Sequence, residues 1–151
     1  MVVVLVCGPA GVGKTTVATA LRERLADRGL SFDALHSDDF SRDTYRRMFE
    51  RVADSGADWI VDGTFYRREW QALFQRLDDE VLVVYLRADL ETCLARNRER
   101  EDQISERGVR VVWHEFDPPR ADVTVEVDEL GAGETVDRVL EGLVPLLEDV
   151  T

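Results

Sequence analysis

The segment 8–15 carries the clearest chemical signal in this sequence of 151 residues. It reads Gly-Pro-Ala-Gly-Val-Gly-Lys-Thr and satisfies the spacing G-x-x-x-x-G-K-T of a phosphate-binding loop. Small residues let successive backbone N–H groups point at phosphate oxygens, and the start of a following helix adds a positive dipole end. We expect Lys14 to reach the β and γ phosphates of a nucleotide and Thr15 to bind a magnesium ion. The predicted phosphate contacts are Gly8, Ala10, Gly11, Val12, Gly13, Lys14, Thr15 and Thr16.

Lysine usage supports a ligand over the alternative, a glycine-rich turn that binds nothing. Lys14 is the only lysine among 19 basic residues, and all the others are arginine. A compact ammonium differs from a planar guanidinium, so the single lysine marks a position where arginine does not substitute. The lack of a second lysine also excludes the Asn-Lys-x-Asp motif with which GTP-binding switch proteins read guanine. A large motor ATPase would need a longer chain, and a nucleotide-sensing regulator would leave the acidic and basic motifs described below without a purpose. A small kinase is the class that remains.

Acidic residues follow the second predicted strand, in the segment 37–42, which reads Ser-Asp-Asp-Phe-Ser-Arg. Adjacent carboxylates at the end of a strand can position magnesium-bound water and accept a proton from an attacking hydroxyl group. We expect Asp38 or Asp39 to be this base, Asp39 to join Thr15 at the metal, and Arg42 to hold an anionic substrate. The alternative is a solvated Asp-Asp turn that caps the next helix.

A third group follows the next strand, where Asp62 is expected to act on the magnesium shell. Tyr66 and Arg67 are predicted to grip the acceptor, although Arg67 and Arg68 cannot face the same way on a helix. The alternative for this arginine pair is a solvated surface.

A fourth group lies on a later helix, where Arg96 and Arg100 are spaced i, i+4 and share a face. On a lid that closes over a nucleotide, this pair would neutralise charge on the transferring phosphoryl group. The alternative is an ordinary salt-bridged surface, since acidic residues follow directly.

Short β-branched runs alternate with amphipathic stretches along the chain, which predicts an α/β fold with buried parallel strands. The expected strands are 2–6, 32–36, 59–61, 81–86 and 122–127. Helices are expected at 14–28, with Gly29 as the C-terminal cap, at 70–77 and at 136–147. Two more are expected after the N-terminal caps Ser41 and Asp89. The helix after Ser41 should direct four side chains inward, those of Tyr45, Met48, Val52 and Ala53. Without repeats or a linker, residues 1–151 are predicted to form a single domain.

Composition limits the partners and the compartment. The chain has 31 acidic residues and a formal net charge of −12, which disfavours broad nucleic-acid binding. With the arginine bias, this charge resembles proteins from salt-loving cells, where screening would leave a tRNA partner open. The apolar run 2–7 is far shorter than the roughly 20 residues of a membrane span, which predicts a cytoplasmic protein without a membrane partner. Cys7 and Cys93 are expected to be buried free thiols, and no motif indicates an oligomeric state.

The residues together resemble the small P-loop kinases that include adenylylsulfate kinase and the seryl-tRNA kinases. The segment 37–42 is similar to the pattern D-G-D-x-x-R of the former, with Asp39 and Arg42 in matching places and Ser37 where the first acid stands. Tyr66-Arg67 is similar to the P-Y-R element of the same kinases. The segments 62–66 and 93–97 look closer to the seryl-tRNA kinases, and 117–122 resembles the stretch near adenine.

This resemblance implies a three-layer P-loop NTPase fold with a five-stranded parallel sheet in the order 2-3-1-4-5, and ATP as the donor. The Lys- and Gly-rich loop of adenylylsulfate kinases is missing between Arg100 and Pro118. With its last residue at Thr151, the chain is expected to lack the RNA-binding extension of the tRNA branch. We expect an ATP- and Mg²⁺-dependent kinase that phosphorylates a hydroxyl group of a small anionic metabolite, with adenylylsulfate as a candidate. The alternatives are a kinase acting on a tRNA or polynucleotide end and an ATP-binding regulator without catalysis.

Overall fold

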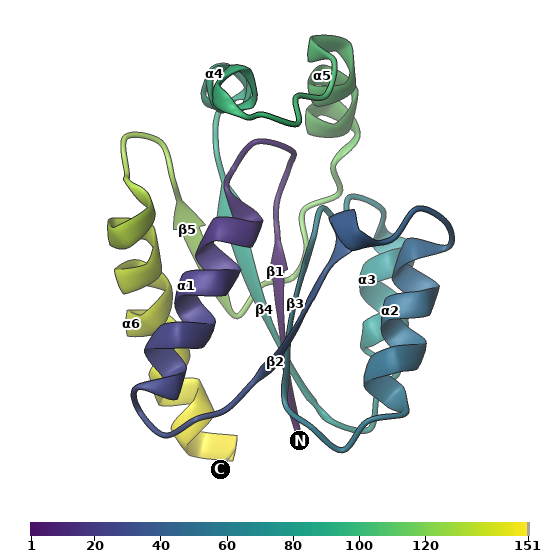
Figure 1. Cartoon of the computed structure of the whole chain (residues 1–151), viewed down its shortest axis with the longest axis vertical. Helices are drawn as coiled ribbons and strands as arrows, with labels where there is room; N and C mark the ends of the chain where they lie inside the picture. The colour runs from purple at the N-terminus through teal and green to yellow at the C-terminus, as the bar shows by residue number, and fades with distance from the viewer. Residues whose placement is uncertain (151) are drawn as a thin grey trace.

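A computed structural model describes residues 1–150 of the chain. They form a five-stranded parallel sheet in the order β2-β3-β1-β4-β5 (Figure 1). The strands are β1 Val2–Cys7, β2 Asp33–His36, β3 Trp59–Gly63, β4 Glu80–Arg87 and β5 Val123–Glu126. This confirms the predicted α/β fold and the strand order implied by the resemblance to P-loop kinases.

Helices cover both faces of the sheet and its upper edge (Figure 1). One face is covered by α1 Lys14–Ala26 and α6 Ala132–Val150, and the other by α2 Thr44–Ala53 and α3 Arg68–Phe74. Above the carboxyl ends of the strands stand α4 Leu90–Glu99 and α5 Glu106–Glu115, which we call the lid together with their connecting loop. None of the helices described within residues 1–150 is both long enough and apolar enough to cross a membrane.

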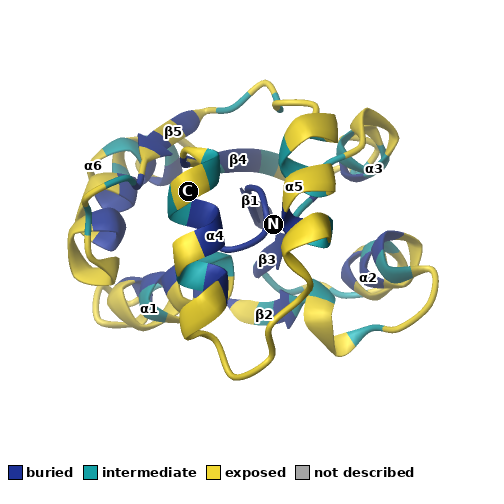
Figure 2. Ribbon diagram, turned by 90° about the horizontal axis from the view of Figure 1, so that it is seen from above, coloured by how far each residue is buried: buried dark blue, intermediate teal, exposed yellow. Residues whose placement is uncertain are grey.

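The central strand β1 explains why its sequence is continuously apolar. Every one of its residues is buried, because alternate side chains enter two separate cores. Val2, Val4 and Val6 pack towards α1 and α6. Val3, Leu5 and Cys7 pack towards α2 and α3, with the buried aromatic rings of that side. Figure 2 shows the buried central strand β1 between α1 and α6 on one side and α2 and α3 on the other. The two cysteines are free and buried, as predicted.

The parallel arrangement brings the ends of three strands to one edge, below the lid. Asp62 of β3 pairs in register with Val6 of β1 on one side and with His36 of β2 on the other. The loop after β1 and the 3-10 turn Ser37–Asp39 after β2 leave the sheet at the same edge. Residues far apart in the sequence therefore meet where ligands bind in open α/β sheets.

Several predicted helix boundaries are wrong. Helix α2 begins at Thr44 rather than after Ser41, because Asp43 adopts a left-handed conformation with φ of 46° that helical residues cannot share. Ala53 ends this helix and is exposed, not inward. Leu77 lies beyond the end of α3. The predicted C-terminal cap of α1 is confirmed, since Gly29 has φ of 83° and the N–H of Leu30 donates to Leu25.

The helix α5 was not predicted. Its apolar residues Val109, Val112 and Trp113 are spaced i, i+3 and i+4, a helical pattern that the sequence reading passed over. Val109 is the one residue of α5 that is fully buried. Its start is nevertheless capped, because the N–H of Gly108 donates to the Ser105 hydroxyl at 3.0 Å.

Candidate active site

The loop between β1 and α1 needs its glycines for two different reasons. Gly11 and Gly13 have φ of 92° and 90°, a left-handed conformation that side chains rarely adopt. Gly11 also lies so close to α4 that a Cβ there would be 2.5 Å from the carbonyl oxygen of Cys93. The loop is therefore shaped by its own dihedral angles and by contact with the lid.

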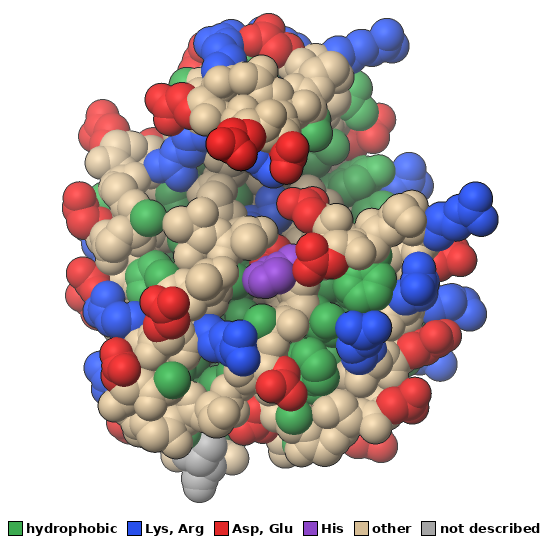
Figure 3. All heavy atoms as spheres, viewed as in Figure 1, with side chains coloured by type: hydrophobic (Ala, Val, Ile, Leu, Met, Phe, Trp, Pro, Cys, Tyr) green, Lys and Arg blue, Asp and Glu red, His purple; other side chains and the backbone are tan. Residues whose placement is uncertain are grey.

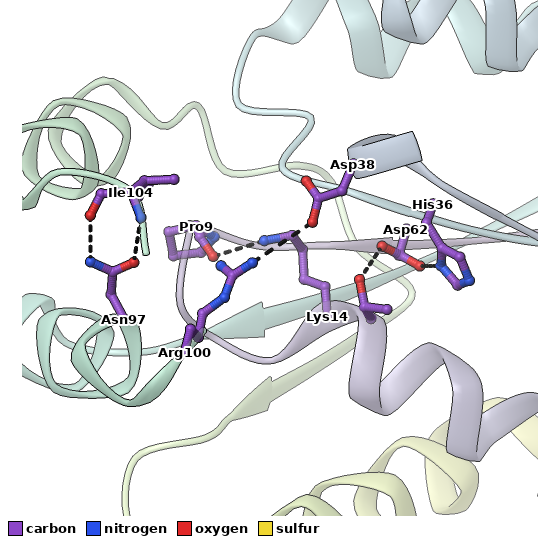
Figure 4. Close-up of polar contacts among 9 residues, drawn as sticks. Pro9, Lys14, His36, Asp38, Asp62, Asn97, Arg100 and Ile104 are labelled. Carbon is purple, nitrogen blue, oxygen red and sulfur yellow. Dashed lines mark hydrogen bonds and ion pairs between the residues drawn. The ribbon is translucent and has the colours of Figure 1, made fainter. Parts of the chain in front are cut away.

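Lys14 is the first residue of α1 and is half-buried under this loop. Its ammonium donates a hydrogen bond to the carbonyl oxygen of Pro9 at 3.0 Å (Figure 4). Burial lowers the pKa of Lys14 to about 8, and the nearby carboxylates of Asp62 and Asp38 oppose this shift. A bound anion at this position would give the half-buried ammonium a charged partner in place of a neutral carbonyl.

Asp62 is the buried acid of the site, with only 2% of its surface exposed. One carboxylate oxygen, Oδ1, accepts a hydrogen bond from the Thr15 hydroxyl at 2.9 Å, and the other, Oδ2, contacts Nδ1 of His36 (Figure 4). Burial raises the pKa of Asp62, while the hydrogen bond and the charge of His36 act in the opposite direction. The Asp62 carboxylate at the end of β3 is thus held by Thr15 on one side and by His36 on the other.

The lid contributes two arginines that behave differently. Arg96 donates from Nη1 to the carbonyl of Val12 at 2.9 Å, and from Nη2 to those of Val127 at 3.1 Å and Leu130 at 2.9 Å. Arg100 follows the end of α4 and reaches towards Asp38, with 3.9 Å between Nη2 and Oδ2 (Figure 4). Arg96 therefore holds these backbone segments together through three carbonyl oxygens, whereas Arg100 lies across the mouth of the site.

The loop between the lid helices is held by Asn97, a buried residue of α4. Its amide donates to the carbonyl of Ile104 at 2.7 Å and accepts from the N–H of Ile104 at 3.1 Å (Figure 4). This pair of bonds closes the loop back onto α4 and limits where Arg100 can lie.

A cavity of about 650 Å³ opens between the lid and the carboxyl ends of the strands. Figure 3 shows a hollow below the lid with basic side chains inside it and acidic ones around its mouth. The predicted site residues that line the cavity are Ala10, Gly11, Gly13, Lys14, Thr15, Thr16, Asp38, Asp62, Arg96 and Arg100. The volume lies within the usual range of small-molecule sites.

The other predicted site residues are not brought into this cavity. Gly8 and Val12 shape the loop from behind, and a Cβ at Gly8 would be 2.6 Å from the carbonyl oxygen of Leu86. Asp39 and Arg42 are exposed in the turn before α2. Of the two adjacent acids, only Asp38 lines the cavity together with residues of the loop 8–13, which we call the nucleotide loop.

The predicted acceptor residues Tyr66 and Arg67 form an aromatic surface beside α3. The Tyr66 ring meets Trp70 edge-on at 5.0 Å, and the Arg67 guanidinium lies 5.5 Å from the Tyr66 ring and 5.7 Å from the Trp70 ring. Arg68 instead lines a second cavity of about 740 Å³ between α3 and the segment 118–122, with Leu5 and Cys7 of β1 among its other lining residues. The two arginines face different ways, as the sequence predicted.

Three residues near the cavity were not chosen from the sequence. His36 was passed over although it ends the second predicted strand, at the same edge as Asp38. Thr64 lines the cavity and its hydroxyl pairs with that of Tyr45 at 3.0 Å. Asn97 stands in the fourth group of the sequence but was given no role there, because its partner Ile104 lies in a loop that no pattern predicts.

Comparison with known proteins agrees with this architecture. A family model named AAA_33 and described as an AAA domain matches residues 3–121. The chain belongs to this family. L-seryl-tRNA(Sec) kinase of Methanococcus maripaludis is 24% identical over 164 residues, covering 91% of this chain and 64% of that protein. The chain thus spans less than two thirds of the length of this curated relative.

Solved structures of small kinases have the same fold as this AAA_33 member. A gluconokinase from Sinorhizobium meliloti 1021 superposes with a TM-score of 0.80 at 19% identity, covering 97% of this chain and 93% of that one. The APS kinase CysC of Mycobacterium tuberculosis, in complex with AMPPNP and APS, superposes with a TM-score of 0.70 at 17% identity, covering 93% and 96%. The expected resemblance to this group of P-loop kinases is confirmed.

Proposed function

We propose that the protein is a kinase that transfers the γ-phosphate of ATP to a hydroxyl group of a small anionic metabolite, with Mg²⁺ as cofactor. The observation that carries the proposal is the convergence in one cavity of Lys14, Thr15 and Asp62 from the sheet edge, with Asp38 and Arg100 on the opposite side. Phosphoryl transfer depends mostly on positioning and on neutralising charge, and this cavity supplies groups for both.

The nucleotide would lie with its phosphates against the loop 8–13 and the start of α1. Backbone N–H groups at the beginning of that helix are free to bind phosphate oxygens. Lys14 would exchange the carbonyl of Pro9 for the phosphates, a stronger partner for a half-buried ammonium.

Asp62 at the end of β3 and Thr15 in the first turn of α1 fit a magnesium ion. Mg²⁺ prefers oxygen ligands and is usually held by one or two side chains together with substrate phosphates. The Thr15 hydroxyl and the Asp62 carboxylate, 2.9 Å apart, are such a donor set. Residues 1–150 contain no cluster of three or more acidic, histidine or cysteine side chains that would hold a metal without a nucleotide. When bound, Mg²⁺ would offset the negative charge of the phosphates.

Asp38 and Arg100, on the side of the cavity opposite Lys14 and Asp62, would take part in the transfer step. Asp38 would accept the proton of the acceptor hydroxyl group while the oxygen of that hydroxyl group forms a bond to the γ-phosphorus of ATP. The bond between the γ-phosphorus and the oxygen that bridges it to the β-phosphate breaks, and ADP is released. Arg100, already near Asp38, and Lys14 would stabilise the negative charge on the phosphoryl group. Arg96 would act by holding the loop at Val12 in place.

The acceptor is proposed to be anionic because arginines border both cavities. Arg68 and Arg120 line the second cavity, whose lining includes Cys7, the residue directly before the nucleotide loop. Adenylylsulfate and sugar acids such as gluconate are therefore the first acceptors to test. A tRNA or polynucleotide end is the second candidate, favoured by the 24% identity to a kinase that acts on seryl-tRNA.

The test measures ADP release with ATP, Mg²⁺ and a panel of acceptors, in low and molar salt. Adenylylsulfate, gluconate and other sugar acids, and seryl-tRNA form the panel. Acceptor-dependent ADP release by the wild type, abolished in Lys14→Ala and retained in the control Arg28→Ala, supports the proposal. Binding of ATP without ADP release from any acceptor indicates a regulator, and turnover by Lys14→Ala refutes the site.

A further inference from the structure

We propose that His36 is a positioning residue that fixes the Asp62 carboxylate at the nucleotide site. It would hold Oδ2 on the β2 side, so that Oδ1 stays directed at Thr15 and at the cation bound with ATP. This inference rests on the proposed use of ATP and Mg²⁺.

The strand register puts these two side chains next to each other. His36 is the last residue of β2 and pairs in register with Asp62 of the neighbouring parallel strand β3. Register partners on adjacent strands project from the same face of a sheet. The imidazole therefore reaches Asp62 through Nδ1 without a loop or a long flexible side chain between them (Figure 4).

The two oxygens of Asp62 have different partners, which gives His36 a defined task. Oδ1 accepts from Thr15 and Oδ2 contacts His36. The terminal torsion of an aspartate is broad and roughly two-fold, so a carboxylate held on one side only can rotate and exchange its oxygens. A buried polar atom without a hydrogen-bond partner is also unfavourable, which favours a rotation of the carboxylate that gives Oδ2 a new partner. Removing the imidazole would therefore weaken the alignment of Oδ1 with Thr15.

His36 lies at the surface of the site rather than in the core. Its side chain is 27% exposed, whereas that of Asp62 is 3% exposed. Replacing it with an apolar residue of similar size opens no core cavity, so an effect on metal-dependent binding is separable from an effect on folding. The other histidine, His114, is exposed on α5 and serves as the matched control.

The experiment compares His36→Leu, His36→Asn and His114→Leu with the wild type in the full chain. Titration calorimetry measures the affinity for ATP with Mg²⁺ and in EDTA, and the ratio of the two affinities reports how well the site uses the cation. Loss of a partner behind a metal-binding group typically costs ten- to hundredfold in metal affinity, so we expect this ratio to fall about tenfold in His36→Leu. Affinity in EDTA should stay near the wild-type value, while the melting temperature should fall by a few degrees because Oδ2 of Asp62 loses its buried partner.

His36→Asn provides the rescue, because its amide nitrogen is as many bonds from the backbone as Nδ1 and can donate to Asp62. It should recover most of the ratio, and His114→Leu should leave it unchanged. An unchanged ratio in His36→Leu, or an equal loss in His36→Leu and His36→Asn, overturns the proposal. These measurements need no acceptor, so a failure of the proposed kinase activity is recognised separately by the absence of ADP release.

Discussion

The ammonium of Lys14 is poised to change charge near neutral pH. Burial lowers its pKa to about 8, so the free protein begins to lose this positive charge as the pH rises through that value. Nucleotide phosphates would favour the charged form and raise the pKa in the complex. The state with the higher pKa binds more protons, so ATP binding should take up a proton at and above pH 8.

We therefore predict that affinity for ATP falls as the pH rises above 8, by at most about tenfold per pH unit. Titration calorimetry at pH 7, 8 and 9, in two buffers of different ionisation enthalpy, measures both the affinity and the protons taken up. The absence of proton uptake at pH 9 would contradict the assignment of Lys14 as the phosphate ligand.

Arg96 and Arg100 were predicted as a pair, but their contacts differ. Arg96 donates three hydrogen bonds to carbonyl oxygens, whereas Arg100 makes one long ion pair with an exposed acid. A hydrogen bond from a charged group contributes about 1.5–3 kcal/mol and an exposed ion pair about 0–1 kcal/mol.

We expect Arg96→Met to lower the free energy of unfolding by about 2 kcal/mol, and Arg100→Met to change it by less than about 0.5 kcal/mol. Urea unfolding followed by circular dichroism measures both. Arg100→Met should instead reduce ADP release, and equal losses of stability in the two variants would show that the contacts of Arg96 do not hold the fold.

The nucleotide loop and α4 fit together as two elements rather than as single residues. The loop approaches the carbonyl of Cys93 so closely that only a residue without a side chain fits at Gly11. Gly56, in contrast, has open space around it and a φ that other residues adopt.

Gly11→Ala should therefore push the loop away from α4 and weaken ATP binding by more than about tenfold, since left-handed strain alone costs roughly 1–2 kcal/mol. Gly56→Ala is the matched control and should bind ATP as the wild type does. Calorimetric titration with ATP checks both, and wild-type affinity in Gly11→Ala would mean that the loop can move without loss.

Elements with two buried faces or a clear apolar stripe were predictable, and the strand order followed from the resemblance to P-loop kinases. The α5 helix was missed although Val109, Val112 and Trp113 have helical spacing, because the pattern is only ten residues long and only Val109 is fully buried. Within the site, the loop 8–15 was predictable because the spacing of its glycines, lysine and threonine matches a phosphate-binding loop. The contact of His36 with Asp62 depends on strand register, and the choice of Asp38 over Asp39 depends on a short 3-10 turn, neither of which local sequence patterns specify.

At the scale of the whole molecule, the formal net charge of −12 makes repulsion between surface carboxylates a general cost of folding. The expectation of a salt-adapted protein is a hypothesis that solution conditions can test. At 1 M ionic strength the screening length is about 3 Å, short enough to suppress most of this repulsion.

We predict that the melting temperature rises by several degrees between about 0.05 and 1 M KCl, with most of the rise at the lower concentrations, where screening changes fastest. Differential scanning calorimetry checks this, with sucrose at matched osmolality as the control for general exclusion effects. A flat or falling melting temperature would contradict the role of charge repulsion.

The three hydrogen bonds from Arg96 to carbonyl oxygens have a consequence for folding during synthesis. Val12 is synthesised 84 residues before Arg96, whose guanidinium donates to its carbonyl, and Arg96 also donates to the carbonyls of Val127 and Leu130. The loop that contains Val12 therefore gains all of its contacts only after residue 130 has been synthesised, and a nascent chain that stops short of this residue should carry the nucleotide motif without its native conformation.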